Sequence, residues 1–352
     1  MKTVSLRALS DLDDLPFDEV IDARSPTEYA EDHLPGAVNL PVLDDAERAR
    51  VGTIYTRESR FAARKLGAAL VARNVAGHLE AYLADKPARY RPLVYCWRGG
   101  QRSGAFATIL GQIGWQVGVI EDGWRSYRRL VVRLLYEAAF PAPVRLIDGN
   151  TGTAKTAILQ RVAELGGQVI DLEGLAAHRG SIFGQPPGAV QPSQKGFEGA
   201  LAQAITRLDP SRPVLIEAES SRIGALRLPP KLWLAMCAAR RLRIEAPLPA
   251  RAAWLARAYA DLIEDGDALG ARLGALSQFH AKTRIAEWQV LAAEGRFEAL
   301  AADLMQAHYD PRYARARARH EARPQAETVL PAADLSDAEI DRLAREIVAR
   351  TG

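Results

Sequence analysis

The sequence has few cysteines, little net charge and no long apolar run. Two cysteines in 352 residues are too few for a disulfide framework, which favours a reducing environment. No apolar stretch reaches the roughly 18–20 residues of a membrane span, and the amino-terminal segment turns acidic where a signal peptide would be apolar. The formal net charge of +3 permits a nucleic-acid partner without demanding one. We therefore expect a cytoplasmic protein that does not interact with membranes.

Length and composition indicate two globular domains. The chain has 48% hydrophobic and 25% charged residues, as ordinary folded proteins do. Residues 1–137 alternate short apolar strands with helical stretches, which predicts a small α/β domain with a parallel sheet and an amphipathic linker helix near its end. A second α/β pattern follows a proline-rich stop and covers residues 141–245. We expect residues 246–352, rich in Ala, Leu and Arg, to form a helical carboxy-terminal region.

A cysteine loop lies in the first domain. Cys96 ends an apolar strand, and a loop rich in glycine and arginine separates it from the next helix. The loop amides, the arginines and the helix amino terminus would favour the thiolate and bind an anion carried on its sulfur. This expected anion cradle consists of Trp97, Arg98, Gly99, Gly100, Gln101, Arg102 and Ser103. The alternative for Cys96 is an unreactive cysteine buried at a strand end. The other cysteine, Cys237, lies among apolar neighbours without such a loop, and we expect it in the core.

The segment GNTGTAKT in the second domain follows an expected strand and opens a helix, the setting of a phosphate-binding loop. Its glycines allow tight curvature, Lys155 supplies a mobile charge, and Thr156 offers a hydroxyl ligand. The loop comprises Gly149, Asn150, Thr151, Gly152, Thr153, Ala154, Lys155 and Thr156. Ala154 stands where the usual pattern has glycine, so tight nucleotide binding is less assured. A chance match of eight residues is the alternative.

Polar residues gather in two further places. The turn-rich segment 178–201 makes a poor core, and its length favours a functional loop over a plain surface excursion. The strand VLIEAES ends in glutamates where ATP-dependent proteins hold magnesium with aspartate; a solvent-facing strand end is the alternative. The candidate substrate-binding or supporting residues are His178, Arg179, Ser181, Gln191, Ser193, Gln194, Lys195, Glu217, Glu219, Ser220 and Arg222.

The stretch VIDARSPTEYAEDHLPGAVNLP resembles the opening signature of rhodanese domains, and the resemblance covers roughly residues 4–135. The matching positions are Asp22, Arg24, Glu28, Tyr29, His33, Pro35, Gly36, Ala37, Asn39 and Pro41. Rhodanese domains carry sulfur or selenium on the loop cysteine, which implies that role for Cys96. The resemblance implies a mainly structural role for Asp22, Arg24 and His33.

The order of four motifs over nearly the whole chain resembles the bacterial tRNA 2-selenouridine synthases. These motifs are YCWRGGQRS, GNTGTAKT, HRGSxFG with QPSQKxFE, and IEAESSRIG. The resemblance implies an α/β fold: a rhodanese-like parallel-sheet domain, then a P-loop NTPase-like domain with a helical carboxy-terminal extension. It also implies a tRNA-modifying transferase that converts wobble 2-thiouridine to 2-selenouridine in tRNA(Lys), tRNA(Glu) and tRNA(Gln). The sulfur is first geranylated with geranyl diphosphate, and selenium from selenophosphate then replaces the geranylthio group.

Within that resemblance, Cys96 would carry selenium and the phosphate loop would neutralise the departing diphosphate. His178, Arg179 and Lys195 would complete this pocket or touch RNA. Trp97 is a candidate stacking platform for the splayed base. Candidate contacts to the tRNA backbone are Arg125, Arg128, Arg129 and the arginines of 312–319, with a solvated helix face as the alternative.

No tightly bound cofactor and no metal are expected. Magnesium is compatible with the phosphate loop, but nothing in the sequence calls for it. A direct handover from selenophosphate synthetase is a further candidate interaction.

Two other functions fit parts of the sequence. One is a rhodanese sulfurtransferase fused to an ATP-dependent kinase or ATPase that acts on a small molecule; Ala154, Glu217 and Glu219 count against it. The other is an RNA-binding or scaffold protein with a degenerate phosphate loop, which the complete cysteine loop disfavours.

Overall fold

The computed structural model describes residues 1–181, 183–184, 188–320 and 327–351. The chain divides into two compact units. The first unit comprises Met1–Ala138 and Pro192–Thr206, and the second comprises Ala139–Gln191 and Arg207–Gly352. The sequence placed 192–206 inside the second domain, whereas this segment packs with the first. A chain segment can leave one unit and return to it without any signal in local periodicity.

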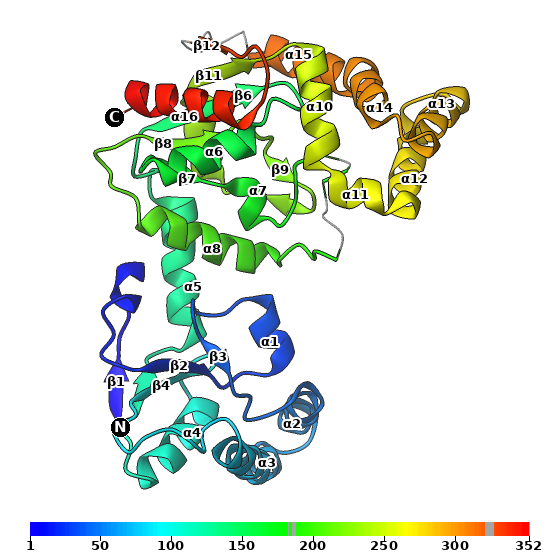
Figure 1. Ribbon diagram of the computed structural model, residues 1–352. Helices are drawn as coiled ribbons and strands as arrows, with labels where there is room; N and C mark the ends of the chain where they lie inside the picture. The colour runs from blue at the N-terminus through cyan, green and yellow to red at the C-terminus, as the bar shows by residue number, and fades with distance from the viewer. Residues whose placement is uncertain (182, 185–187, 321–326, 352) are drawn as a thin grey trace. The chain divides into compact units, whose positions relative to one another are not determined.

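The first unit is built on a five-stranded sheet in the order β1-β5-β4-β2-β3, and all its strand pairs are parallel (Figure 1). This confirms the predicted parallel α/β architecture. The strands are β1 (Lys2–Val4), β2 (Glu19–Asp22), β3 (Val38–Asn39), β4 (Pro92–Tyr95) and β5 (Gly118–Ile120).

The helices of the first unit begin at clear amino-terminal signals. Ser25 and Pro26 open α1 with a capping box, and the Asp44 carboxylate accepts a hydrogen bond from the Glu47 amide at 2.7 Å to cap α2. The expected linker helix is α5 continued by the π-helical turn η2, which ends before the prolines. The helical segments are η1 (Leu9–Leu12), α1 (Pro26–Glu31), α2 (Asp45–Arg57), α3 (Arg60–Glu80), α4 (Gln101–Gln112), α5 (Trp124–Val132), η2 (Arg133–Glu137) and α8 (Gln194–Thr206).

A buried ion pair ties the first sheet to α1. Arg24 Nη2 lies 2.6 Å from Asp22 Oδ2, and both side chains are fully buried. The same guanidinium donates to the Asp32 carbonyl, and the Tyr95 hydroxyl donates to Asp22 Oδ2 at 2.7 Å. These hydrogen bonds offset part of the cost of burying the two charges, while Arg24 Nη1 has no hydrogen-bond partner among the described residues. Asp22 and Arg24 therefore serve the packing of the domain.

The second unit also contains a five-stranded parallel sheet, in the order β12-β11-β6-β8-β7. Its strands are β6 (Val144–Gly149), β7 (Gln168–Ile170), β8 (Val214–Glu217), β11 (Arg240–Glu245) and β12 (Glu327–Pro331), beside an antiparallel pair of β9 (Arg222–Ile223) and β10 (Leu226–Arg227). The sequence predicted a helical carboxy-terminal region. The structure also places a strand there. Its strand β12 forms the sheet edge, and α16 buries Leu343 and Ile347 against the same core.

The remaining helices cover this sheet and extend beyond it. They are α6 (Lys155–Glu164), α7 (Leu172–Leu175), α9 (Pro230–Ala238), α10 (Leu248–Ala258), α11 (Ala260–Glu264), α12 (Gly266–Ala275), η3 (Leu276–Gln278), α13 (Lys282–Ala293), α14 (Phe297–Leu304), η4 (Met305–Tyr309), α15 (Asp310–His320) and α16 (Asp337–Thr351). Figure 1 shows α11 to α14 grouped beside α10. These helices have an apolar cluster of their own around the fully buried Trp288. Within the described ranges, no helix has the length and apolar character that a bilayer crossing requires.

We expect Gly99→Ala to destabilise the first unit. Gly99 has φ +62°, and a Cβ added there would lie 2.6 Å from the Ile120 carbonyl oxygen, so strain and steric overlap add. The unfolding free energy should fall by at least about 2 kcal/mol, seen as a lower melting temperature. Gly104→Ala, in α4 with nothing within 4 Å of the added Cβ, should leave melting unchanged or raised. Equal melting of both variants would contradict this account.

Candidate active site

The phosphate loop has the predicted strand–loop–helix setting. It connects β6, which ends at Gly149, to α6, which begins at Lys155. Gly149 has φ +155° and Gly152 has φ +83°, and a Cβ at Gly152 would lie 2.9 Å from the Arg251 carbonyl oxygen. The loop is thus curled against a neighbouring helix in a way that only glycine allows.

Ala154, the departure from the usual pattern, occupies a left-handed conformation with φ +55° and ψ 27° at the amino-terminal cap of α6. A side chain costs about 1–2 kcal/mol in this region. This explains why the position is usually glycine. The chain keeps the loop shape with alanine because Ala154 is buried in the core beneath it.

An ion pair supports the phosphate loop from behind. The buried Arg251 donates to both carboxylate oxygens of Asp310, at 3.0 and 2.9 Å, and to the Thr151 carbonyl at 3.2 Å. Asn150 Nδ2 donates to the same Asp310 carboxylate at 3.0 Å. Sequence reasoning missed Arg251 and Asp310, because each lies in a helical stretch of ordinary composition and far along the chain from the loop.

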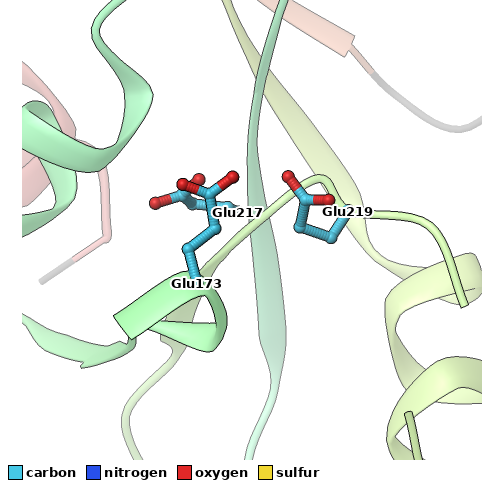
Figure 2. Close-up of side chains that lie close together, drawn as sticks. All are labelled: Glu173, Glu217 and Glu219. Atoms are coloured by element: carbon cyan, nitrogen blue, oxygen red, sulfur yellow. The ribbon is translucent and has the colours of Figure 1, made fainter. Parts of the chain in front are cut away.

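Three glutamates converge beside the loop: Glu173 in α7, Glu217 at the end of β8, and Glu219 just beyond it (Figure 2). One carboxylate oxygen from each of the three lies within 4.8 Å of those from the other two. Burial, together with the neighbouring carboxylates, raises the pKa of Glu173 to about 8, of Glu217 to about 8 and of Glu219 to about 7. Glu173 had no signal in the sequence; only the fold brings it to the other two.

The ammonium of Lys155 belongs to the same charge cluster. Its Nζ donates to the Gly149 carbonyl at 3.1 Å and lies 5.6 Å from the centroid of the Tyr313 ring. Burial opposes the charged form, but Tyr313 and the three carboxylates outweigh it and raise the pKa of Lys155. The lysine therefore stays charged and is positioned to meet an anion on the loop.

The donor set also suits a divalent cation. Carboxylate oxygens are the preferred ligands of Mg²⁺, and the hydroxyl of Thr156 donates to Glu173 Oε2 at 3.2 Å. Neither oxygen of the buried Glu217 has a hydrogen-bond partner among the residues that the structure describes. The sequence indicated no metal ligands; the three converged glutamates are residues that could hold one.

A cavity of about 1060 Å³ opens in front of the loop. Of the predicted residues, Thr151 to Thr156, His178, Arg179, Ser181, Glu217, Glu219 and Ser220 line it. Arg179 is already paired with Asp261, at 3.0 and 2.7 Å. Burial lowers the pKa of His178, whose Nδ1 accepts a hydrogen bond from the Gly180 amide. Both residues therefore shape the wall of the cavity.

Five of the predicted substrate-binding or supporting residues do not line this cavity. Gln191 binds the Ala176 and Ile223 carbonyls and fixes a turn of the second unit. Ser193, Gln194 and Lys195 belong to the first unit, where Lys195 pairs with Glu31 at 2.6 Å. Arg222 is exposed on β9. Sequence proximity to His178 grouped these residues, whereas the chain path separates them.

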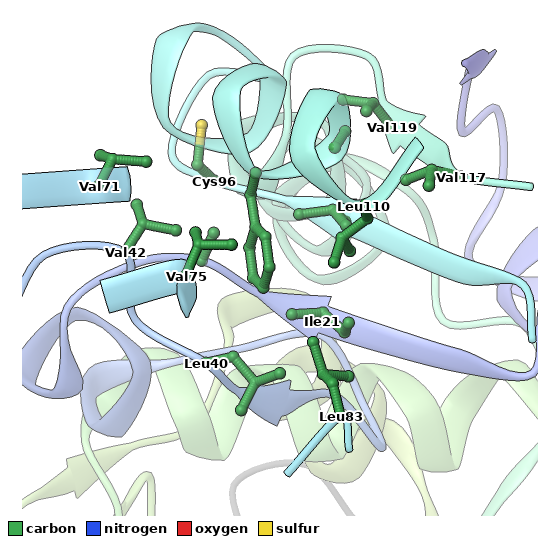
Figure 3. Packing of buried hydrophobic residues seen from close by; sticks show 14 of the residues in the cluster. Ile21, Leu40, Val42, Val71, Val75, Leu83, Cys96, Leu110, Val117 and Val119 are labelled. Carbon is green, nitrogen blue, oxygen red and sulfur yellow. The ribbon is translucent and has the colours of Figure 1, made fainter. Parts of the chain in front are cut away.

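Cys96 follows β4 directly and is only 3% exposed, at one end of the apolar core of the first unit (Figure 3). Its Sγ lies 3.2 Å from the hydroxyl oxygen of Ser103, in the first turn of α4. A Cβ at Gly123 would come within 2.0 Å of the Cys96 carbonyl oxygen, so the loop packs tightly on the segment before α5. The cysteine is thus both buried and beside a helix amino terminus.

We expected both arginines of the cysteine loop to favour an anion on the Cys96 sulfur, but the structure gives them other surroundings. Arg102 pairs with Glu28, at 2.5 Å from Oε2, so its charge is balanced within the domain. Arg98 is exposed. The half-buried Trp97 packs on Trp124, with ring centroids 4.5 Å apart. The cradle around Cys96 therefore consists of backbone and hydroxyl groups more than of arginines.

The other basic candidates are distributed over several settings. Arg128 pairs with the buried Glu198 and Arg129 with Asp122, while Arg125 is exposed. Arg312 lies over the Phe279 ring at 4.2 Å and lines the phosphate cavity. The side chains of 316–320, with two of the predicted arginines, lie outside the described residues. Cys237, expected in the core, is half-buried and lines the phosphate cavity.

Two domain families match the chain in succession. The rhodanese-like domain matches residues 5–130, and the tRNA 2-selenouridine synthase AAA domain matches residues 142–285. The fold and the two loops thus define a rhodanese-like domain joined to an AAA, P-loop-like domain.

Proteins named tRNA 2-selenouridine synthase align with most of the chain. The protein of Chromohalobacter salexigens is 39% identical over 245 residues, which are 69% of this chain and 66% of that protein. Those of Psychromonas ingrahamii and Shewanella halifaxensis are 33% and 36% identical, over 72% and 70% of this chain and 69% and 67% of their own lengths. The chain belongs to the tRNA 2-selenouridine synthase family and, as a member, is an enzyme. The alignments span about two thirds of the length of these relatives.

We expect Asp310→Ala to destabilise the second unit by about 3–5 kcal/mol, because it leaves the Arg251 guanidinium buried without its partner. Urea unfolding of the full chain measures the loss. Glu294→Ala is the matched control, since it breaks the exposed pair with Arg296 and should have little effect. If the two variants unfold alike, the pair does not support the loop.

The three glutamates predict a pH dependence of stability. Their pKa values are raised in the folded state, so the folded chain holds protons that the unfolded chain has released. Stability should therefore fall as pH rises from about 5 through 8. Calorimetric melting in EDTA should show a smaller fall for Glu217→Gln than for the unaltered chain. Glu287→Gln, on the exposed pair with Arg284, should keep the original dependence; an unchanged dependence in Glu217→Gln would contradict the assignment.

Proposed function

We propose that this chain converts the wobble 2-thiouridine of tRNA(Lys), tRNA(Glu) and tRNA(Gln) to 2-selenouridine, with a geranylated intermediate, in the cytoplasm. Family membership supports the overall conversion. The observation that supports two separate steps is the presence of two unlike reactive sites: a curled phosphate loop with a charged lysine in one unit, and a buried loop cysteine in the other.

The first step transfers the geranyl group. The thiocarbonyl sulfur attacks C1 of geranyl diphosphate, a C–S bond forms, and the allylic C–O bond breaks with both electrons leaving on the diphosphate. The base gives up its N3 proton to solvent as the C2–N3 double bond forms. Negative charge grows on the leaving group, where the loop amides and Lys155 Nζ can bind it. The three glutamates oppose that charge unless they hold protons or a divalent cation, so this step depends on their neutralisation.

The second step replaces the geranylthio group with selenium from selenophosphate. The selenium of selenophosphate attacks C2 of the base, the C–S bond breaks and geranylthiolate leaves with both electrons; hydrolysis of the Se–P bond then releases phosphate, so the step needs no oxidant. Cys96 is the nucleophilic residue that handles the selenium-bearing anion in this exchange, and the α4 amino terminus favours an anion on its sulfur. With Arg102 held by Glu28, the exposed Arg98 is the remaining loop cation to attract selenophosphate. Because Sγ is buried, transfer requires the loop from Trp97 to Gly100 to open.

Binding of tRNA rests on exposed cations near the cysteine loop. Arg98 and Arg125 are exposed and suit phosphate contacts, and Trp97 offers an aromatic face for the base. A direct handover from selenophosphate synthetase would shield selenophosphate on its way to Cys96.

Nucleoside mass spectrometry of thiolated tRNA tests the assignment. With geranyl diphosphate and selenophosphate, Lys155→Ala should lose both products, because the leaving group is no longer neutralised. Cys96→Ser should accumulate the geranylated nucleoside and form no 2-selenouridine. Cys237→Ser, which changes the only other cysteine, should still selenate tRNA that is already geranylated. Normal selenation by Cys96→Ser, or turnover of ATP in place of geranyl diphosphate, would overturn the proposal.

A further inference from the structure

An apolar recess opens from the phosphate cavity into the helical part of the second unit. Its deeper wall is formed by Phe183, Leu262, Leu269, Leu300, Leu304 and Met305, each less than 9% exposed. Thr151, Ser181, Leu255, Tyr259 and Tyr309 line both the recess and the cavity. The two spaces therefore share part of their walls, and the phosphate loop itself supplies one of the shared residues, Thr151.

The residues that line the two spaces differ in polarity. The loop side carries Lys155 and three glutamates, whereas the recess is lined almost wholly by carbon. Polar atoms occur at its mouth, where the Tyr259 and Ser181 hydroxyls lie 3.5 Å apart. A ligand that fills both spaces must join an anionic head to an apolar tail. A nucleotide does not fit this description, because its base and ribose would place unpaired polar groups against carbon.

The wall of the recess is part of an ordered core. Five of its residues belong to the apolar cluster around Trp288, which α11 to α14 share (Figure 1). Trp288 is itself fixed by a hydrogen bond from Nε1 to Asp303 at 2.5 Å. Because closely packed side chains form the recess, it keeps its shape and selects ligands by their size.

We propose that this recess receives the distal part of the hydrocarbon tail of an allylic diphosphate whose head is bound by the loop from Gly149 to Thr156. The proposal rests on the proposed function, since it assigns a place to the tail of the geranyl donor. On this proposal, helices α10 to α14 take part in substrate binding. Burial of the tail next to the reacting carbon excludes water, which would otherwise capture an allylic cation.

Calorimetric titration of the full chain with two probes, geranyl diphosphate and inorganic pyrophosphate, tests the proposal. Leu300→Trp fills the recess and should weaken geranyl diphosphate binding at least about tenfold, in line with the transfer energy of a few buried methylenes. Binding of pyrophosphate should stay within about twofold. The unaltered chain should also show a more negative heat-capacity change with geranyl diphosphate than with pyrophosphate, and Leu300→Trp should lose that difference.

Two further variants keep the test decisive. Val290→Trp adds the same ring on the exposed face of α13, where the native side chain is 53% exposed, and should bind both probes like the unaltered chain. Leu300→Ala enlarges the recess and should gain affinity for a longer prenyl diphosphate, farnesyl diphosphate. Equal loss of both probes in a folded Leu300→Trp, or no loss of either, overturns the recess assignment. Failure of the unaltered chain to bind geranyl diphosphate, with pyrophosphate still bound, overturns the proposed function instead.

Discussion

The balance of charge around Lys155 is the constraint on which the rest of the second unit depends. One half-buried ammonium faces three glutamates, each with a carboxylate oxygen within 4.8 Å of one from the others, and partial burial weakens the screening of these charges by water. Three ionised carboxylates would repel any diphosphate that the loop binds. Burial and the neighbouring carboxylates raise the pKa of all three groups, to about 7 or 8, and this favours their protonated forms. A divalent cation would instead neutralise the ionised carboxylates directly, and it would bind the carboxylates and the diphosphate at the same time.

A second constraint, backbone strain, explains why the loop needs support from distant parts of the chain. An alanine in a left-handed conformation at the α6 cap is strained, so the loop cannot hold its shape by local preference alone. Arg251 and Asp310 clamp it from behind, and both come from the helical region that follows the core of the domain. That region is therefore part of the site. Its helices fix the loop on one side and enclose the apolar recess on the other.

The sequence correctly predicted the features that are formed by consecutive residues. The strand–loop–helix units around Cys96 and Lys155 were recognisable because their signals are contiguous. The alternation of strands and helices predicted the parallel sheet of the first domain and an α/β pattern for the second. Contacts between distant segments had no such signal in the sequence. Only the fold brings Glu173 next to Glu217. The ion pair between Arg102 and Glu28 could not be predicted either, because the two residues lie far apart in the chain. The short strand β12 was hidden after a basic helix. The segment 192–206 was assigned by its neighbours in the sequence, whereas its packing places it in the first unit.

The two reactive groups share one physical property, seclusion from water, although they lie in different units. Cys96 is closed off by apolar side chains and a tightly packed turn, and Lys155 lines the cavity that shares walls with the carbon-lined recess. For an allylic diphosphate, seclusion suppresses capture of the reacting carbon by water, and it strengthens each interaction that stabilises the leaving group. For a cysteine that handles selenium, seclusion limits loss of the transferred atom before the acceptor arrives. On this argument the burial of Cys96 is compatible with a catalytic role, because a loop that opens only to its substrate meets the same requirement.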